Sequence, residues 1–349
     1  MKSILVFYPQ LDKPLSGGQV IDFEFINQIR TSGLFSMSFF QDSDLKSSSI
    51  FSYNFYLLLH VRQFLKYDVI FMNSRPYPRM FLFVLLLRIL FFRGKLITYH
   101  HHYNYLIHKG FKRIVHKTFE LSFLKLMNNV IVPSPYTFQL TRSFINDSKI
   151  KYIEIGFDND IKENKCTNPY KWLFVGTVES RKGVDNLIKI ADILRDKRIN
   201  IEFDIVGSLS DTIYVDKMKN EIRLYGLEKH ISLLGRIDDE SLKHEYETSY
   251  GFIFPSLHEG YGMVLIEAMR YGLPVIAFDN SAMPYTIKNF YNGILVEDKN
   301  FIKMGDMICK LIEDKETYNK MQMNAYDTVR KIKTHSHMIE DMKKYIEEL

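Results

Sequence analysis

Residues 251–278 read GFIFPSLHEGYGMVLIEAMRYGLPVIAF, and this stretch decides the fold. An apolar run at 251–254 is followed by a loop with two glycines, and residues 263–271 then have helical character. A glycine and a proline close this helix before a second apolar run at 274–278. The stretch therefore predicts a strand, a glycine loop, a helix and a second strand.

Similar apolar runs recur along the chain at spacings that leave room for a helix between them. They lie at 4–8, 69–72, 96–99, 130–132 and 153–157 in the first half, and at 172–175, 201–206 and 231–234 in the second. Such alternation is typical of parallel sheets covered by helices, and the polar residues 158–169 are expected to link two such sheets. We therefore predict an α/β fold of two doubly wound, Rossmann-like domains that face a central cleft. The expected domains are 1–160 and 161–325, with a helix at 326–349 that packs back on the first domain.

Composition excludes several classes of protein. The chain has 349 residues, of which 46% are hydrophobic and 25% charged, as in ordinary soluble proteins. Its two cysteines exclude a disulfide scaffold and a cysteine-rich zinc module. The apolar run at the N-terminus is too short for a signal peptide, and no apolar stretch has the length of a membrane-spanning helix. We expect a cytoplasmic protein.

Charge is distributed unevenly between the two halves. Residues 1–165 contain 21 Lys/Arg and 12 Asp/Glu, a net charge of +9, whereas residues 166–349 contain 25 and 29, a net charge of −4. The first half is therefore expected to meet an anionic partner. Residues 81–92 are apolar on every face of a helix, which fits either a core helix or an interface. Because cations bracket this run, we expect peripheral association with the inner face of the plasma membrane. Nucleic acid is not expected, because no module that reads it is present.

The glycine loop at 259–262 offers a place for an anion. A helix that begins after Gly262 presents backbone N–H groups to a phosphate. Glu259 precedes this helix and Glu267 lies near its end, with seven residues between them. With a diphosphate at the helix start, the first carboxylate can face a sugar and the second can accept hydrogen bonds from ribose hydroxyls. Two carboxylates with separate tasks explain the spacing.

These residues resemble the retaining glycosyltransferases of family 4, which have the GT-B fold. The matching motifs occur in the family's order: Val175–Gly183, Ile205–Gly207, Pro255-Ser256, Glu259–Gly262, Glu267–Met269, Gly272–Ile276 and Asn292–Val296. The resemblance covers nearly all of the second half, and it is looser in the first half. Two positions depart from the family pattern, because Thr177 stands where arginine is common and Tyr285 where glutamate is common.

The resemblance implies a hexosyltransferase that moves a sugar from a UDP- or GDP-linked donor to a saccharide acceptor and keeps the anomeric configuration. It also implies a role for each matching residue: Glu259 contacts the transferring sugar, Glu267 binds the ribose, Arg181 and Lys182 bind the pyrophosphate, and Gly262 with the backbone N–H groups of Val264 and Leu265 lies near the phosphates. Two cations suit a leaving group that gains negative charge. No metal or other cofactor is then needed, and we interpret the acidic pattern Asp42-Ser43-Asp44 as chance. A lipid-linked saccharide used in surface polysaccharide assembly fits the basic and apolar first half as the acceptor.

Two features of the first half are candidate site residues. Gly17 and Gly18 follow the first strand, so the backbone there can approach a phosphate or an acceptor. Three histidines follow the strand at 96–99, where family members often have a histidine that faces the donor sugar. His100 aligns best and His101 is the alternative, while a solvated loop of histidines remains a third interpretation.

Other functions remain open from the sequence alone. A nucleotide-sugar epimerase or a phosphorylase of the same fold would share most of these motifs. The non-enzymatic alternative is a subunit that binds nucleotide and assists a membrane glycosyltransferase without catalysing a reaction itself. The presence of Glu259, Glu267 and Lys182 together favours the enzyme.

Overall fold

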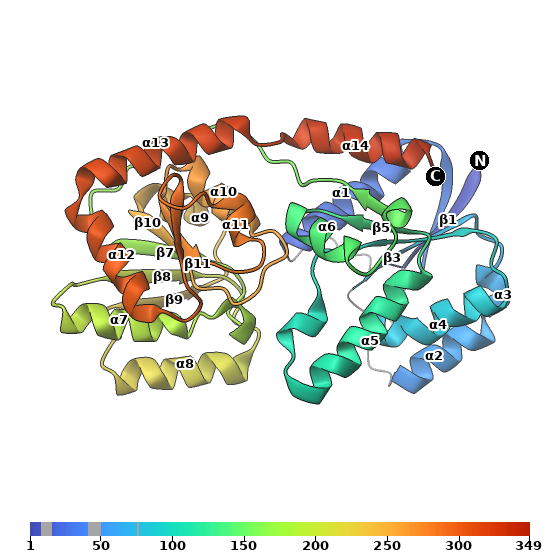
Figure 1. The fold of residues 1–349 in the computed structure, drawn as a ribbon, viewed down its shortest axis with the longest axis horizontal. Coiled ribbons are helices and arrows are strands. Elements are labelled where there is room, and N and C mark those ends of the chain that lie inside the picture. The colour runs from blue at the N-terminus through green and yellow to red at the C-terminus, as the bar shows by residue number, and fades with distance from the viewer. Residues whose placement is uncertain (8–15, 41–49, 75–76) are drawn as a thin grey trace. The chain divides into compact units, whose positions relative to one another are not determined.

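A computed structural model divides the chain into two compact units (Figure 1). The described residues are 1–7, 16–40, 50–74 and 77–349, and residues 50–53 are described through their backbone alone. The N-terminal unit comprises Met1–Gly156 and Lys333–Leu349, and the C-terminal unit comprises Phe157–Ile332. Each described unit contains a six-stranded sheet whose neighbouring strands run parallel. The predicted class of two doubly wound, Rossmann-like domains is confirmed.

The sheet of the N-terminal unit has the strand order β2-β1-β3-β4-β5-β6. Its strands are β1 (Lys2–Phe7), β2 (Phe35–Phe39), β3 (Val69–Asn73), β4 (Lys95–Tyr99), β5 (Asn129–Val132) and β6 (Ile150–Tyr152). The helices of this unit are α1 (Gly17–Thr31), α2 (Ile50–Leu59), α3 (Val61–Phe64), α4 (Tyr77–Ile89), α5 (Gly110–Leu126), α6 (Pro135–Arg142) and α14 (His335–Glu347). The inner strands β3 and β4 are almost wholly buried, which explains why they are continuous apolar runs.

Two strands of this sheet differ from the expectation. β2 has the sequence FSMSF, in which two serines interrupt the apolar run that would have revealed a strand. The prediction of a strand at 153–157 was wrong, because the ladder with β5 is formed by Ile150–Tyr152. The backbone N–H groups of Ile153 and Ile155 still donate to carbonyls at the end of β5, so the apolar residues continue beside it without regular pairing.

The sheet of the C-terminal unit has the strand order β12-β11-β10-β7-β8-β9. Its strands are β7 (Lys171–Val175), β8 (Glu202–Val206), β9 (Ile231–Gly235), β10 (Gly251–Phe254), β11 (Val275–Phe278) and β12 (Gly293–Val296). The helices are α7 (Asn186–Asp196), α8 (Thr212–Leu224), α9 (Asp239–Thr248), α10 (Met263–Arg270), α11 (Met283–Thr286), α12 (Phe301–Glu313) and α13 (Lys315–Lys331). The strand, loop, helix and strand expected at 251–278 are present as β10, α10 and β11.

The polar stretch 158–169 is part of the C-terminal unit and not a free linker. The backbone N–H of Lys162 donates to the carbonyl of Arg270, and that of Lys165 to the carbonyl of Glu247, both at 2.7 Å. These bonds hold the stretch against α10 and α9. The boundary therefore lies between Gly156 and Phe157, slightly before the expected position.

The C-terminal residues form two helices where one was expected at 326–349. Ile332, which follows α13, has extended backbone, and the side chain of Thr334 accepts the N–H of His337 to start α14. α13 belongs to the C-terminal unit, whereas α14 belongs to the N-terminal unit and packs on α1. The chain thus returns to its first unit at residue 333.

The apolar run 81–92 is divided between core and surface. α4 packs between α2 and α5, and Phe83, Val84 and Leu87 are fully buried. Leu82 and Ile89 remain exposed, as does Phe91 just beyond the helix. Across the part of the chain that the structure describes, no helix is both long enough and apolar enough to cross a membrane.

Candidate functional site

The C-terminal sheet changes its winding direction between β7 and β10. From β7 the chain proceeds outward to β8 and β9, whereas from β10 it proceeds to β11 and β12 on the other side. Open α/β sheets bind ligands at the carboxyl ends of strands at such a point. The loops that follow β7 and β10 carry the residues predicted for donor binding, so the topology brings them together.

The loop after β7 is held tightly against the loop after β10. It forms a short 3₁₀ helix, Ser180–Lys182, that ends at Gly183 with φ of 61°. A Cβ atom at Gly183 would lie 2.2 Å from the carbonyl oxygen of Pro255, so glycine is required for this approach. The N–H of Leu257 donates to the carbonyl of Arg181 at 2.9 Å. Arg181 and Lys182 are therefore fixed relative to the glycine loop.

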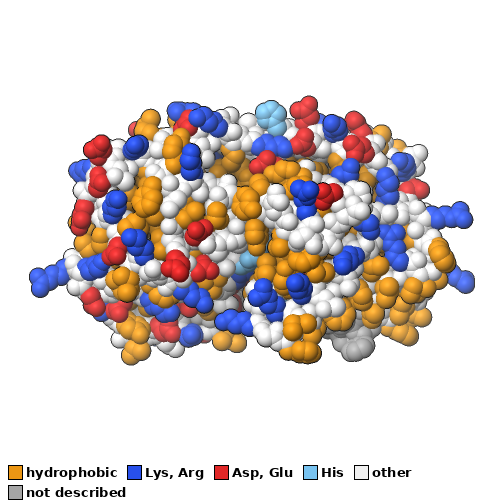
Figure 2. All heavy atoms as spheres, in the orientation of Figure 1, with side chains coloured by type: hydrophobic (Ala, Val, Ile, Leu, Met, Phe, Trp, Pro, Cys, Tyr) orange, Lys and Arg blue, Asp and Glu red, His pale blue; other side chains and the backbone are white. Residues whose placement is uncertain are grey.

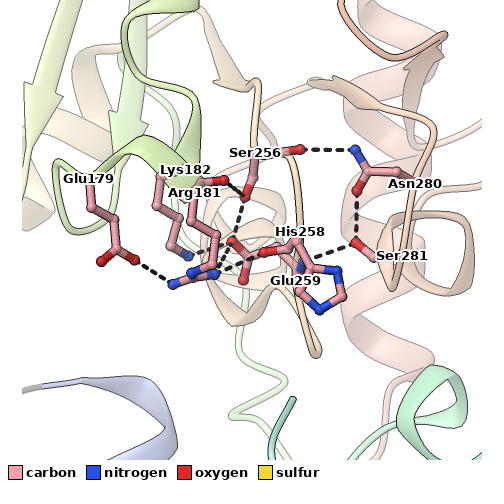
Figure 3. Close-up of polar contacts among 8 residues, drawn as sticks. All are labelled: Glu179, Arg181, Lys182, Ser256, His258, Glu259, Asn280 and Ser281. Carbon is pink, nitrogen blue, oxygen red and sulfur yellow. Dashed lines mark hydrogen bonds and ion pairs between the residues drawn. The ribbon is translucent and has the colours of Figure 1, made fainter. Parts of the chain in front are cut away.

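A cluster of four side chains forms where the two loops meet (Figure 3). One carboxylate oxygen, Oε1 of Glu259, accepts hydrogen bonds from Lys182 Nζ at 2.6 Å and from Ser256 Oγ at 2.7 Å. Arg181 Nη1 lies 3.3 Å from the same oxygen. We call Glu259, Lys182, Arg181 and Ser256 the Glu259 cluster. Of the residues predicted from the sequence, Glu259, Arg181 and Lys182 are thus in direct contact.

The Glu259 carboxylate is ionised although it is buried. Burial by itself raises the pKa of Glu259, but the neighbouring cations Lys182 and Arg181 lower it by a larger amount, so that the pKa falls to about 2. Burial lowers the pKa of Lys182, and the Glu259 carboxylate opposes that change. Lys182 and Arg181 are therefore held by the Glu259 carboxylate, whose negative charge partly compensates theirs.

Several supporting residues were not predicted. Ser281 Oγ accepts the backbone N–H of Glu259 at 2.9 Å, and Asn280 Nδ2 donates to the carbonyl of Ser256 at 3.0 Å (Figure 3). Glu179 Oε1 accepts from Arg181 Nη2 at 2.6 Å. Asn280 and Ser281 lie in the loop that follows β11, and the carboxyl ends of parallel strands lie on one edge of the sheet. The position of these two residues after a predicted strand could therefore have identified them from the sequence.

Arg181 Nη1 also donates a hydrogen bond to the backbone carbonyl of His258 at 2.8 Å. The His258 ring is buried, and burial lowers its pKa to about 4. The ring is therefore neutral at physiological pH and adds no charge to the cluster.

Helix α10 begins after Gly262, which has φ of 86° and is left-handed. A Cβ atom there would lie 2.8 Å from the side chain of Met283, so the position favours glycine. The N–H of Leu265 already donates to the carbonyl of Gly262 at 2.9 Å. Leu265 was predicted to offer this N–H to a phosphate, and the structure instead uses it within the turn. Of the two predicted amides, Val264 is then the better candidate.

Glu267 contacts a different set of residues. Its Oε2 accepts a hydrogen bond from the hydroxyl of Tyr246, on α9, at 3.1 Å. Burial raises the pKa of Glu267, and the Tyr246 hydroxyl and Arg270 partly offset that rise. The two glutamates therefore differ in environment, because Glu259 is paired with cations and Glu267 with a neutral hydroxyl.

The N-terminal unit has a second polar cluster at its own winding switch, between β1 and β3. His101 Nε2 lies 2.8 Å from Oδ1 of the buried Asp22, and Asn73 Nδ2 lies 2.5 Å from Oδ2. The His101 ring stacks on Tyr99, with 4.8 Å between centroids. Gly18 lies beside that ring, because a Cβ atom there would be 3.4 Å from it. Gly17 and Gly18 form the start of α1.

His100 lies in the core. Its side chain is fully buried, its Nδ1 lies 2.9 Å from Ser74 Oγ, and burial lowers its pKa to about 3. His101 retains 16% exposure of its side chain. Of the two histidines left open by the sequence, His101 is therefore the one with a partly exposed side chain.

The described residues contain no group of three or more His, Cys, Asp or Glu side chains arranged to hold a metal ion. The pattern Asp42-Ser43-Asp44 lies outside the described residues.

Two family descriptions match the chain, and together they extend over both units. "Glycosyltransferase Family 4" matches residues 28–161, and "Glycosyl transferases group 1" matches residues 157–328. The two segments meet at the boundary between the units. The second segment includes the Glu259 cluster, Glu267 and α10.

Curated relatives match parts of the chain. An uncharacterized glycosyltransferase of Haemophilus influenzae is 33% identical over 150 residues, which cover 43% of this chain and 41% of the relative. The capsular polysaccharide biosynthesis glycosyltransferase CapM of Staphylococcus aureus is 28% identical over 198 residues, which cover 50% of this chain and 49% of CapM. The chain thus matches less than half the length of each of these two relatives.

A solved structure is similar over the whole chain. HepE of Anabaena, in complex with UDP-glucose, has a TM-score of 0.77 and 16% sequence identity, and the match covers 100% of both chains. At this identity the likeness concerns the fold.

Proposed function

Because this chain belongs to glycosyltransferase family 4 and has the GT-B fold, we propose that it transfers a sugar from a UDP- or GDP-linked donor to a saccharide acceptor with retention of configuration. The observation that carries this proposal is the Glu259 cluster at the winding switch of the C-terminal sheet. Two ordered cations and one buried carboxylate are placed where this class of sheet binds its ligand.

The cluster suits a donor with a pyrophosphate. Lys182 and Arg181 bind the two phosphates, with the Val264 amide at the start of α10 as a further donor. Glu267 accepts hydrogen bonds from the ribose hydroxyls. The pairing of Lys182 with Glu259 keeps both side chains ordered in the free protein, so little side-chain entropy is lost when the donor binds.

The reaction exchanges one bond at the anomeric carbon for another. The bond to the diphosphate oxygen breaks, and its electron pair leaves with the nucleoside diphosphate. The acceptor hydroxyl oxygen bonds to the same face, and its proton passes to the departing phosphate. Lys182 and Arg181 stabilise the negative charge that develops on the leaving group, and Glu259 stabilises the positive charge on the sugar. The two cations perform the neutralisation for which other enzymes use a metal ion, so no cofactor is required.

The acceptor in this proposal is a lipid-linked saccharide of surface polysaccharide assembly, used at the inner face of the plasma membrane. CapM, one of the relatives, is named for capsular polysaccharide biosynthesis. The excess of basic residues in the first half suits an acceptor with a diphosphate. We assign the sugar-facing role in the N-terminal unit to His101, because His100 is buried.

The test is a panel of UDP- and GDP-linked sugars with the full chain, with and without EDTA. We expect one donor to be hydrolysed slowly alone and transferred when an acceptor is added, and the product to keep the anomeric configuration of the donor by NMR. Lys182→Met is expected to weaken binding of that nucleotide, whereas Lys189→Met, an exposed change in the same unit, is not. Donor epimerisation without transfer, or binding without any turnover, would refute the transferase.

Asp22 provides a second prediction for the reaction. Asp22→Asn removes the carboxylate that holds the His101 ring, and we expect kcat to fall about tenfold, a loss of about 1.4 kcal/mol of transition-state stabilisation. Nucleotide affinity by calorimetry is expected to be unchanged, because the donor cations belong to the other unit. Glu24→Gln, on the same helix, is the control. An equal loss of kcat in both variants would contradict this role for Asp22.

A further inference from the structure

The first three turns of helix α5, with the residue before them, present apolar and basic side chains to solvent. Phe111, Ile114 and Phe119 are 80%, 62% and 43% exposed. Lys109, Lys112 and Arg113 are exposed as well, and Lys117 is half-buried, with its ammonium group over two aromatic rings. We call these seven residues the α5 face. Single exposed apolar side chains are common on soluble proteins, but three large ones at this exposure on one helix are unusual.

The charge on the α5 face is not neutralised by nearby acids. Glu120 is the only acidic residue of α5, and it is buried. Its two carboxylate oxygens accept the backbone N–H groups of Asn104 and Tyr105, each at 2.9 Å, so it points into the unit. Among the residues that the structure describes, none of the four cations forms an ion pair with a carboxylate. The α5 face therefore carries an uncompensated positive charge.

The run 81–92, for which the sequence indicated a membrane interface, packs against α5 through helix α4. Four of its twelve residues are buried and four, Leu82, Ile89, Leu90 and Phe91, are exposed. Phe81 packs edge-on against Phe119, with 5.3 Å between ring centroids. Leu82, on the same helix, is exposed and extends the apolar surface. In Figure 2, hydrophobic and basic side chains gather over the part of the N-terminal unit where Figure 1 places α5 and α2.

The position of α5 relates this surface to the candidate site of its unit. α5 follows β4 through the loop that carries His101, so its first turn lies at the carboxyl-end edge of the sheet. Phe111 and Lys112 lie in that first turn. A surface that binds the α5 face would therefore lie on the same edge as His101 and the start of α1.

We infer that the α5 face docks the enzyme on an anionic lipid bilayer, with Phe111 and Ile114 inserted among the headgroups and the exposed cations Lys109, Lys112 and Arg113 against the lipid phosphates. Exposed aliphatic and aromatic side chains beside cations suit a leaflet, whose interface offers both apolar and anionic contacts. Nucleic acid would account for the charge but not for Ile114. This inference rests on the proposed function, because a lipid-linked acceptor is what docking at this edge would serve.

The test is co-sedimentation of the full chain with vesicles of phosphatidylglycerol and phosphatidylcholine, and with vesicles of phosphatidylcholine alone. We expect binding to the anionic vesicles that weakens with added salt. Two charge reversals, Lys112→Glu with Arg113→Glu, are expected to lower the partition coefficient at least 25-fold, since each cation near such a surface contributes about fivefold. Phe111→Ser with Ile114→Ser is expected to reduce the binding that remains at high salt.

Matched controls distinguish this face from general charge and hydrophobicity. Arg62→Glu with Lys66→Glu makes the same charge change at exposed positions elsewhere in the unit, and Ile213→Ser removes an exposed side chain in the C-terminal unit. Ile213→Ser is expected to leave vesicle binding unchanged. Arg62→Glu with Lys66→Glu is expected to weaken it only by the effect of the lower net charge of the protein. Unchanged binding by the α5 variants, or equal binding to both kinds of vesicle, would overturn the inference and leave a protein partner as the occupant.

Turnover with a short, water-soluble acceptor separates this inference from the proposed function. The α5 variants are expected to keep that activity and to lose transfer to a lipid-linked acceptor in vesicles. If no donor is turned over but vesicle binding still depends on α5, the docking surface is supported and the proposed transferase activity is refuted. If transfer to the water-soluble acceptor occurs but the α5 variants bind vesicles normally, the docking surface is refuted and the proposed transferase activity is not.

Discussion

Glu259→Gln is expected to lower kcat for sugar transfer by about 10²–10³-fold, the usual cost of losing one preorganised electrostatic contact to a transition state. The substitution keeps the size of the side chain and removes its charge. Lys182 and Arg181 remain in place and lose the carboxylate that competes with phosphate for them. Affinity for the nucleoside diphosphate is therefore expected to be retained or to increase, while turnover is lost.

The measurement is kcat for transfer together with the dissociation constant of the nucleotide by calorimetry. Glu179→Gln is the control, because Glu179 also pairs with Arg181 but is more exposed and does not contact Lys182. We expect that variant to lose little kcat. If Glu259→Gln weakens nucleotide binding as strongly as it lowers kcat, Glu259 acts by ordering the cations and not on the sugar.

The loops of the proposed donor site were largely predictable, because their residues belong to sequence motifs that have a physical reason. Gly183 and Gly262 are needed for left-handed backbone and close approach, and such positions can be read from glycine spacing. Arg181, Lys182 and Glu259 follow strands that are neighbours in the sheet, so their meeting follows from the alternation of strands and helices. The ion pair among them, with 2.6 Å between Lys182 and Glu259, was not predicted.

The features that could not be predicted depend on packing between distant segments. His100 and His101 are adjacent in the sequence, and which of them is buried depends on which side of the sheet β4 presents at its end. The partner of His101 is Asp22, 79 positions away, and no local pattern relates the two. The run 81–92 is apolar on all sides, so its exposed part could be located only once α2 and α5 were placed against it.

Lys182→Met is expected to destabilise the C-terminal unit and to abolish tight nucleotide binding. Removing one partner of a buried ion pair leaves the other charge uncompensated, which costs about 3–5 kcal/mol of unfolding free energy. For a unit of this size each kcal/mol corresponds to about 2–4 °C in Tm, so a fall of about 6–20 °C is expected. Arg181 and Ser256 still contact Glu259, which favours the lower end of that range.

The pH dependence gives an independent measurement of the same pair. The pKa of Glu259 is lowered in the folded protein from 4.5 to about 2, so its contribution to stability is present above pH 4.5 and is lost as the pH falls toward 2. Without Lys182 this depression of the pKa is smaller. The unfolding free energy of Lys182→Met is therefore expected to decline less between pH 4.5 and 2 than that of the unmodified chain.

The double variant, Lys182→Met with Glu259→Gln, separates stability from function. It removes both charges, so neither is left buried and uncompensated, and most of the lost Tm is expected to return. Activity is not expected to return, because the cation proposed for the leaving group and the carboxylate proposed for the sugar are both absent. If the double variant is as unstable as Lys182→Met alone, the loss arises from packing of the lysine stem and not from the charge on Glu259. If it recovers activity together with stability, the cluster is a structural element and the reaction is carried by other residues.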